Sequence, residues 1–330
     1  MDEERRSRIE RIDAGLNART ILRSEDEPRI DRASLEEAWS RLVPAFAAIA
    51  PRDPSIAGFR IFWTRGAETG IREITCAPGA HLVVGRHSSC DVSLSADAEL
   101  SLRHLLLVTE AARSDDEEPT LRLLDLMAFL PMYAGDDVPH RSLRAQGAFA
   151  VRLGRYVLGG FRIGPGAPPP PADAPLDAAI DAPMPPPRAS RSERTSTLMR
   201  LDRPSTLIEV LDERVPGGVG TITATRRGHR VRAVVTGDQL DRGVLVGRAD
   251  KCLDRGMRAL MSTSVSRVHA VLIRNDGRTM IYDAASMNGT FHEGARVRSV
   301  IVGERGARVH LAGPDGIELS YEPLAANEER

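Results

Sequence analysis

The chain has 330 residues, enough for about two domains that each bury a core of their own. Its net charge of -1 indicates neither a nucleic-acid surface nor attraction to an anionic membrane, and no apolar run has the length of a membrane helix. The cysteines Cys76, Cys90 and Cys252 are too widely spaced for a disulfide framework or a metal-binding pair. The charged N-terminus continues into no apolar leader, so the expected location is the cytoplasm.

Residues 1–55 are expected to form a charged N-terminal segment with one short helix. Ser34-Leu35-Glu36-Glu37 fits a capping box, and apolar residues then recur at helical spacing around Trp39 until Pro44 interrupts them. The Trp39 face should dock on something. A neighbouring β domain is the simpler partner, and a separate protein is the alternative.

Residues 56–164 consist of short apolar runs of β type separated by polar loops, which predicts an all-β sandwich. Residues 165–204 are rich in proline and alanine and are expected to be a disordered linker. Thr195 and Thr197 lie in its basic far end and are candidate kinase substrates.

Residues 205–324 again show short β-type runs, which predicts a second sandwich. A strand is expected at Leu207 to Leu211, followed by a glycine turn at Gly217 to Gly220. The long loop from Ala249 to Thr263 contains Met257, Leu260 and Met261, and could form a turn of helix beside the loops described next.

Three clusters in this second region lie between predicted strands: Gly247-Arg248, Ser264 to His269, and Asn288-Gly289-Thr290. Together they supply a guanidinium, hydroxyls, an amide and glycine backbone N–H groups. Loops of this kind at one end of a rigid β scaffold suit an anionic ligand, and phosphate is the commonest such ligand.

In this order the clusters resemble the forkhead-associated (FHA) domain family, whose pattern is Gly-Arg, then Ser-x-x-His, then Asn-Gly. The resemblance implies a β-sandwich that binds phosphothreonine peptides with loops at one end. It assigns phosphopeptide binding to Arg248, Ser266, Arg267 and Asn288. It also implies that Gly247, His269 and Gly289 have structural roles.

The first region carries a degenerate copy of the same pattern. Gly85-Arg86 precedes Gly247-Arg248 by 162 residues, and Ser101-Leu102-Arg103-His104 precedes the second Ser-x-x-His by 165 residues. In the second region, Asn288 lies five residues after Asp283. The same step from Asp125 in the first region reaches Leu130, which is followed by Pro131 and not by glycine. This third element therefore offers neither the asparagine amide nor the conformationally permissive glycine. Arg86, Ser101 and Arg103 could still hold a phosphate, with Gly85 and His104 as structural residues. The alternative is a structural or protein-contact role, since Phe129, Leu130, Met132 and Tyr133 make this loop apolar.

The fold class is therefore expected to be all-β, with two FHA-like β-sandwiches joined by a linker. The expected function is a phosphothreonine-binding adaptor in Ser/Thr kinase signalling, whose partners are kinase substrates or the kinase itself, with neither nucleic acid nor membrane as a partner. Self-recognition of a phosphorylated linker is a variant, and a phosphate-independent scaffold is the alternative. No cofactor, metal site or enzymatic activity is expected, because none of the usual catalytic motifs occurs.

Overall fold

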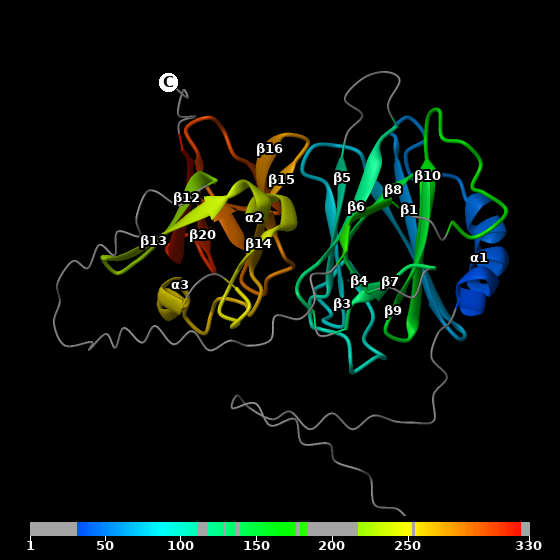
Figure 1. Cartoon of the computed structure of the whole chain (residues 1–330), viewed down its shortest axis with the longest axis horizontal. Helices are drawn as coiled ribbons and strands as arrows, with labels where there is room; N and C mark the ends of the chain where they lie inside the picture. Colours follow the sequence, from blue (N-terminus) through cyan, green and yellow to red (C-terminus); the bar gives the residue numbers. More distant parts are fainter. Residues whose placement is uncertain are drawn as a thin grey trace, which may run out of the picture.

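Two β-sandwiches lie side by side in the computed structural model of the chain (Figure 1). The structure describes residues 32–110, 118–128, 130–135, 139–175, 179–183, 217–252 and 255–324. The all-β fold class is confirmed. The remaining residues, which include Phe129, Thr195, Thr197 and the strand expected at Leu207 to Leu211, lie outside the described part of the chain.

The first sandwich is built from one continuous path of paired strands in the order β2-β1-β10-β9-β7-β8-β6-β5-β3-β4, with β11 added to β8. Neighbours on the path pair antiparallel except β3 and β4. Phe59, Leu107 and Phe149 are among the fully buried residues of its core. The strands are β1 (Gly58–Arg65), β2 (Glu68–Thr75), β3 (His81–Gly85), β4 (Val92–Ser93), β5 (Leu105–Glu110), β6 (Thr120–Asp125), β7 (Met132–Tyr133), β8 (Pro139–Gln146), β9 (Ala148–Leu153), β10 (Tyr156–Ile163) and β11 (Ala179–Pro183).

The second sandwich packs a sheet of order β13-β12-β21-β20-β17-β18 against a sheet of order β14-β15-β16-β19. Its core between these sheets includes Ile222, Leu272, Ile281 and Val309. Its elements are β12 (Gly218–Arg226), β13 (His229–Thr236), α2 (Gly237–Arg242), β14 (Val244–Val246), α3 (Arg255–Leu260), β15 (Ala270–Asn275), β16 (Arg278–Asp283), β17 (Thr290–His292), β18 (Ala295–Val297), β19 (Ser299–Ile301), β20 (Ala307–Leu311) and β21 (Ile317–Pro323). Helix α3 is the turn of helix expected in the long loop, and Met257 on it is fully buried.

Helix α1 (Arg32–Ala47) covers the outer face of the first sandwich (Figure 1). Trp39 is buried there and its ring lies 5.8 Å from that of Phe62, so the helix docks on the adjacent β domain. The helix does not stop at Pro44 as expected, because apolar packing continues to Phe46 and the carbonyl of Pro44 still accepts the Ala48 N–H. Ser34 consequently lies inside the helix instead of capping it. In the described residues no helix has the length and apolarity needed to cross a bilayer.

The start of the expected linker is docked on the first sandwich. Trp39 Nε1 donates a 2.9 Å hydrogen bond to the carbonyl of Pro171, and β11 pairs antiparallel with β8. Strands β6 and β7 pair with β8 along its other edge, so β11 can pair with the backbone groups from His140 to Arg144 that face away from them. The prediction of an unstructured linker from residue 165 was therefore wrong for these segments.

The glycines at the start of the second sandwich form strand, not the expected hairpin turn. Strand β12 begins at Gly218, and the turn to β13 lies at Arg227 and Gly228, whose φ values are 49° and 82°. A Cβ at Gly220 would lie 2.2 Å from the Tyr321 hydroxyl. Gly220 therefore permits close packing between strands. The sequence analysis predicted a turn because clustered glycines are typical of turns.

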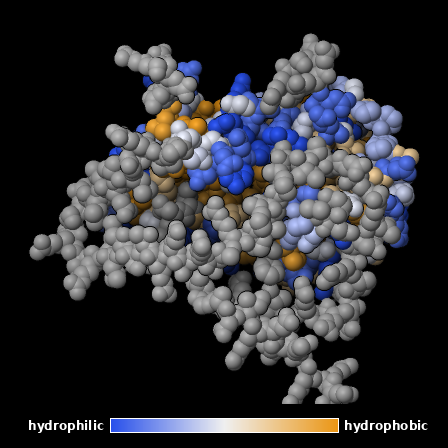
Figure 2. All heavy atoms as spheres, in the orientation of Figure 1, coloured by the Kyte–Doolittle hydropathy of each residue, from blue (hydrophilic) through white to orange (hydrophobic). Residues whose placement is uncertain are grey.

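A third apolar core joins the two sandwiches. The first contributes Val83, Cys90, Leu106, Val108, Leu124 and Leu126, and the second contributes, among others, Leu245, Cys252, Val271, Ile273, Tyr282 and Ala284. These are matching positions of the internal repeat, on or next to β3, β5 and β6 in one copy and β14, β15 and β16 in the other, with Cys90 and Cys252 in the loops after β3 and β14. The sandwiches thus meet through equivalent faces, as the subunits of a two-fold dimer do. Figure 2 shows hydrophilic residues over the upper part of the junction on the face in view, so the apolar contact is bordered by polar residues there.

Candidate functional site

The Arg248 side chain projects from the end of β14, where the chain turns against the loop before β15. A Cβ at Gly247 would lie 2.4 Å from the carbonyl oxygen of Arg267, so only glycine permits this close approach. Arg248 N–H donates to Ser266 O at 3.2 Å, and Nε donates to Val265 O at 3.0 Å. These bonds fix the direction of the exposed guanidinium. Within the described residues its two terminal amino groups have no partner, which leaves a fork for a bidentate acceptor.

Ser266 and His269 tie this loop to the loop that carries Asn288. The Ser266 N–H donates to His269 Nδ1 at 3.1 Å, and His269 Nε2 lies 3.0 Å from Gly289 O. The N–H of Met287 donates to Ser266 Oγ at 3.1 Å. The Ser266 side chain is 8% exposed and keeps its own hydroxyl proton for another acceptor.

Asn288 is exposed at the end of the second sandwich that also carries Arg248 and Ser266, and the loops at this end are called the rim below. Its Nδ2 donates to Ser264 O at 2.7 Å, which orients the amide oxygen and places Asn288 beside the Ser266 loop. Gly289 follows with φ of 81°, and a Cβ there would lie 2.5 Å from Arg296 Nε. The structure therefore brings Arg248, Ser266 and Asn288 to one rim through a continuous set of hydrogen bonds. Arg267 is exposed directly beside Ser266.

The Asn288 loop depends on a carboxylate that the sequence analysis did not single out. Asp283 accepts from the Ser286 N–H at 2.8 Å, from Ser286 Oγ at 2.6 Å and from Thr290 Oγ1 at 2.7 Å. Ser286 Oγ in turn accepts from the Gly289 N–H at 3.0 Å. This network shapes the loop from within. The spacing of an acid, a serine and a threonine around Asn-Gly is the sequence signal that could have indicated it.

Arg296 on β18 is a further cation that the sequence analysis missed. Its Nη2 donates to Ser286 O at 3.4 Å, and the side chain is exposed. With Arg248 and Arg267 it makes this rim electropositive. The nearby carboxylate of Asp250 is paired with Arg258.

The first copy keeps the Arg-Ser half of this arrangement. Arg86 N–H donates to Ser101 O at 3.2 Å, its Nε donates to Leu100 O at 2.8 Å, and its guanidinium is exposed. The Ser101 N–H donates to His104 Nδ1 at 3.2 Å, as in the second copy. A Cβ at Gly85 would lie 2.5 Å from Leu102 O, so Gly85 permits the same close approach as Gly247.

The third loop of the first copy differs in content and in length. His104 Nε2 lies 2.7 Å from Leu130 O, the position that Gly289 O holds against His269. The count from Asp125, which matched Leu130 with Asn288, is therefore shifted by one residue. Leu130 packs against the core of its own sandwich and offers no amide to a peptide.

Arg103 was included among the possible phosphate-binding residues, and this part of the prediction is wrong. Its side chain is 5% exposed and its guanidinium lies at the junction of the sandwiches, where Nε donates to Ala284 O at 2.6 Å and Nη2 donates to Ala285 O at 2.5 Å. The second copy has Val268 at the equivalent position. An arginine one residue later in the motif therefore faces the neighbouring sandwich.

Burial favours the neutral form of both motif histidines. Burial lowers the pKa of His269 below its usual 6.5 and lowers that of His104 to about 4. Because the unfolded chain takes up these protons first, their contribution to stability is complete above pH 6.5 and declines as the pH falls toward the folded pKa. Nitrogen-detected NMR at pH 7.5 should show both rings with the proton on Nε2. Doubly protonated rings at that pH would contradict the hydrogen bonds described above.

Comparison with known families supports the sequence resemblance. Residues 244–312, which lie within the second sandwich and include the motif contacts above, match the family model of the FHA domain. The family model does not extend to the first sandwich, which repeats the Arg-Ser-His contacts of the second. None of the curated proteins matches the chain significantly.

Several solved structures are similar to part of the chain. FHA-1 of Mycobacterium tuberculosis Rv1747 is 27% identical, with 32% of this chain and 99% of that chain covered and a TM-score of 0.26. The FHA domain of Chlamydia trachomatis CT664 is 18% identical, with coverages of 32% and 96% and a TM-score of 0.25. The yeast Dun1 FHA domain, in complex with a doubly phosphorylated peptide derived from Rad53 SCD1, is 13% identical, with coverages of 46% and 95% and a TM-score of 0.28.

Proposed function

We propose that the second sandwich binds phosphothreonine peptides through Arg248, Ser266, Arg267 and Asn288, and that the chain is an adaptor in Ser/Thr kinase signalling. The observation that carries the proposal is the convergence at one rim of a serine hydroxyl, an oriented amide and a guanidinium whose terminal amino groups have no partner in the described part of the chain. Each lies on a different loop, and each is held by hydrogen bonds from the others' loops. Such a site is preorganised for a ligand with several acceptor oxygens.

Different residues of the site would bind the phosphate and the backbone of the peptide. Arg248 would give a forked, charge-assisted contact to the phosphate, the Ser266 hydroxyl would donate to a second oxygen, and Arg267 and Arg296 would add attraction. Asn288 would donate to and accept from the peptide backbone, which fixes its register. Hydrogen bonds to charged groups contribute roughly 1.5 to 3 kcal/mol each, and after the cost of ordering the peptide the expected affinity is on the order of micromolar.

The partner would be a protein phosphorylated on threonine, either a kinase substrate or the kinase itself. A phosphorylated Thr195 or Thr197 in the chain's own segment between the sandwiches is a special case. A flexible tether provides an effective concentration near millimolar, enough to fill a micromolar site within the chain or in a neighbouring copy. Phosphorylation would then switch the site off for other partners.

A phosphate-independent scaffold is the second candidate, favoured by the extensive apolar junction and by Met127, whose exposed fraction is 54% in the apolar loop of the first copy. Calorimetric titration of the whole chain with a phosphothreonine peptide pool and with its unphosphorylated counterpart separates the two. The adaptor predicts binding only with phosphate. Equal heats and affinities for both pools would favour the scaffold.

Asn288→Ala should weaken phosphopeptide binding about ten-fold, because the peptide backbone loses its amide partner while the phosphate contacts stay. Inorganic phosphate, which has no backbone, should compete equally well at the variant and at the natural protein. Competition titrations with labelled peptide measure both quantities. A variant that loses phosphate and peptide affinity in the same proportion would mean that Asn288 holds the phosphate itself.

A further inference from the structure

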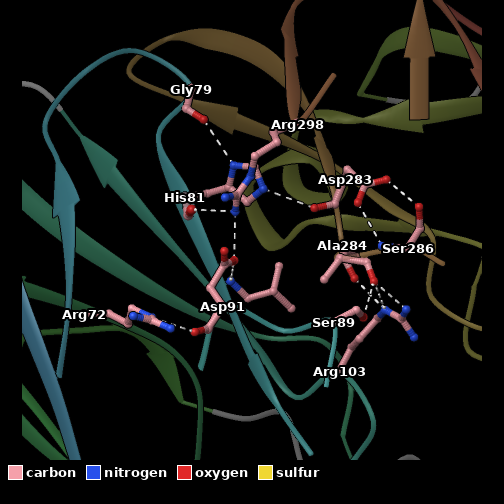
Figure 3. Close-up of polar contacts among 12 residues, drawn as sticks. Arg72, Gly79, His81, Ser89, Asp91, Arg103, Asp283, Ala284, Ser286 and Arg298 are labelled. Carbon is pink, nitrogen blue, oxygen red and sulfur yellow. Dashed lines mark hydrogen bonds and ion pairs between the residues drawn. The ribbon is translucent and has the colours of Figure 1, made fainter. Parts of the chain in front are cut away.

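The backbone leading into Asn288 is held from outside by the first sandwich. The carbonyls of Asp283 and Ala284 face polar groups on the neighbouring copy (Figure 3), and the carbonyl of the next residue, Ala285, accepts from Arg103 Nη2. His81 Nε2 lies 3.1 Å from Asp283 O, and Ser89 Oγ donates to Ala285 O at 2.8 Å. Arg103 reaches both Ala284 O and Ala285 O.

The held segment has an unfavourable backbone conformation. Ala285 has a φ of 54°, in the left-handed region that non-glycine residues rarely adopt. It is followed at once by Ser286, Met287 and Asn288, which carry the bonds to Asp283, Ser266 and Ser264. Donors that fix the carbonyls of Ala284 and Ala285 therefore also fix the direction in which the chain enters the rim.

The second copy makes an equivalent set of hydrogen bonds to the third loop of the first copy. Lys251 Nζ of the second copy donates to Leu126 O at 2.5 Å and to Met127 O at 2.9 Å, and Met127 has a φ of 52°. By the repeat spacing, Lys251 corresponds to Ser89, and Leu126 and Met127 correspond to Ala284 and Ala285. Each copy thus holds the third loop of the other. Only the loop held by Arg103 continues into Asn-Gly.

Further hydrogen bonds between the two copies lie next to His81, on the side away from the rim. Arg298 Nη2 donates to Asp91 Oδ2 at 2.8 Å and to His81 O at 3.2 Å (Figure 3). Asp91 Oδ2 also accepts from the Val83 N–H within its own sandwich. The residues of the first copy that contact the segment before Asn288 therefore lie next to the shared apolar core and are tied to it by hydrogen bonds.

We propose that the degenerate first copy positions the peptide-recognition loop of the second, with Arg103 as the positioning residue. This inference rests on the proposed function, and it assigns the first sandwich a role that needs no phosphate binding of its own. With the loop fixed before the ligand arrives, less conformational freedom is lost on binding. The docking of the sandwiches and the affinity for peptide are then coupled, so each strengthens the other.

The test uses the whole chain and three variants. Arg103→Met removes the donors while keeping an apolar stem of similar length. Arg103→Lys keeps a donor that can reach two carbonyls, as Lys251 does on the mirrored side. Arg122→Met is the matched control, because Arg122 also crosses the junction, to the carbonyls of Asp241 and Arg274, at the end of β15 opposite the rim.

For a phosphothreonine peptide selected on the natural protein, Arg103→Met should bind about ten-fold more weakly, a size within the usual range of coupling between sites. Arg103→Lys should recover most of the affinity, and Arg122→Met should bind as the natural protein does, even where its melting temperature falls further. Unchanged affinity in Arg103→Met, or an equal loss in Arg122→Met, would overturn the proposal.

Amide hydrogen exchange without peptide provides a readout that does not depend on the proposed function. Exchange at the Met287 and Gly289 N–H groups, which bond to Ser266 and Ser286, should accelerate in Arg103→Met and stay unchanged in Arg122→Met. Unaltered exchange in Arg103→Met would contradict the positioning role. If the natural protein binds phosphorylated and unphosphorylated peptides alike, the proposed function fails, and exchange alone then decides whether the loop is held by Arg103.

Discussion

Replacing Arg248 by alanine should abolish most of the affinity for phosphothreonine peptides, a loss of about 2 kcal/mol or more. The guanidinium is exposed, and its only hydrogen bond from a side-chain nitrogen in the described residues is the 3.0 Å contact from Nε to Val265 O, so its removal breaks one hydrogen bond to the backbone and leaves the apolar core unchanged. The folded structure should therefore persist. Isothermal titration gives the affinity, and a melting curve within about 1 °C of the natural protein would show that the fold is intact.

Arg86→Ala is the matched control for this prediction. Arg86 occupies the same position in the first copy, with the equivalent 2.8 Å bond to Leu100 O and the same exposure. It lies beside a loop without an asparagine amide, so its loss should change peptide affinity little. A larger loss for Arg86→Ala than for Arg248→Ala would place the working site on the first sandwich.

Tyr282→Ala should destabilise both sandwiches, by about 3 kcal/mol, because it empties part of the core that they share. Tyr282 is fully buried on β16, and its ring lies 4.9 Å from that of His81 in the first copy. Its hydroxyl accepts from Asn275 Nδ2 at 3.3 Å, and the same amide also donates to Thr109 O across the junction. The substitution therefore removes apolar contact and loosens a hydrogen bond between the copies.

The two tryptophans of the chain, Trp39 and Trp63, make this effect measurable, because both lie in the first copy while Tyr282 lies in the second. Denaturant unfolding followed by tryptophan fluorescence should shift to lower concentration in Tyr282→Ala, together with the transition seen by circular dichroism. A fluorescence transition identical to that of the natural protein would mean that the sandwiches unfold independently.

The strands of the fold were largely predictable because they depend on local pattern. Runs such as Leu82 to Val84 and Ala270 to Ile273 are β-branched or apolar and bounded by turn residues. Helix α1 continued past Pro44, and Gly218 to Gly220 formed strand, because packing against Phe62 in one case and against Tyr321 in the other outweighed local preference. β11 depended on a free edge of β8, which no local pattern reveals.

The site was predictable where a residue's role follows from its motif. Gly247, Arg248, Ser266 and Asn288 could be listed together because their order along the chain indicates three loops at one end of a sandwich. The position of Arg103 could not be predicted in this way. Whether an arginine beside a motif faces the rim or a neighbouring domain depends on how the domains pack. The strands that join the two copies have the same apolar sequence as any strand buried on both faces, so the sequence did not reveal the contact between the copies.

The most direct measurement is an amide NMR titration of the whole deuterated chain with a phosphothreonine peptide. We expect the signals of Arg248, Ser266, Asn288 and Gly289 to shift with the phosphorylated peptide and to stay in place with its unphosphorylated form, while those of Arg86 and Ser101 remain unchanged. Shifts that begin at Arg86 and Ser101, or shifts at the second rim that are the same with and without phosphate, would contradict the account.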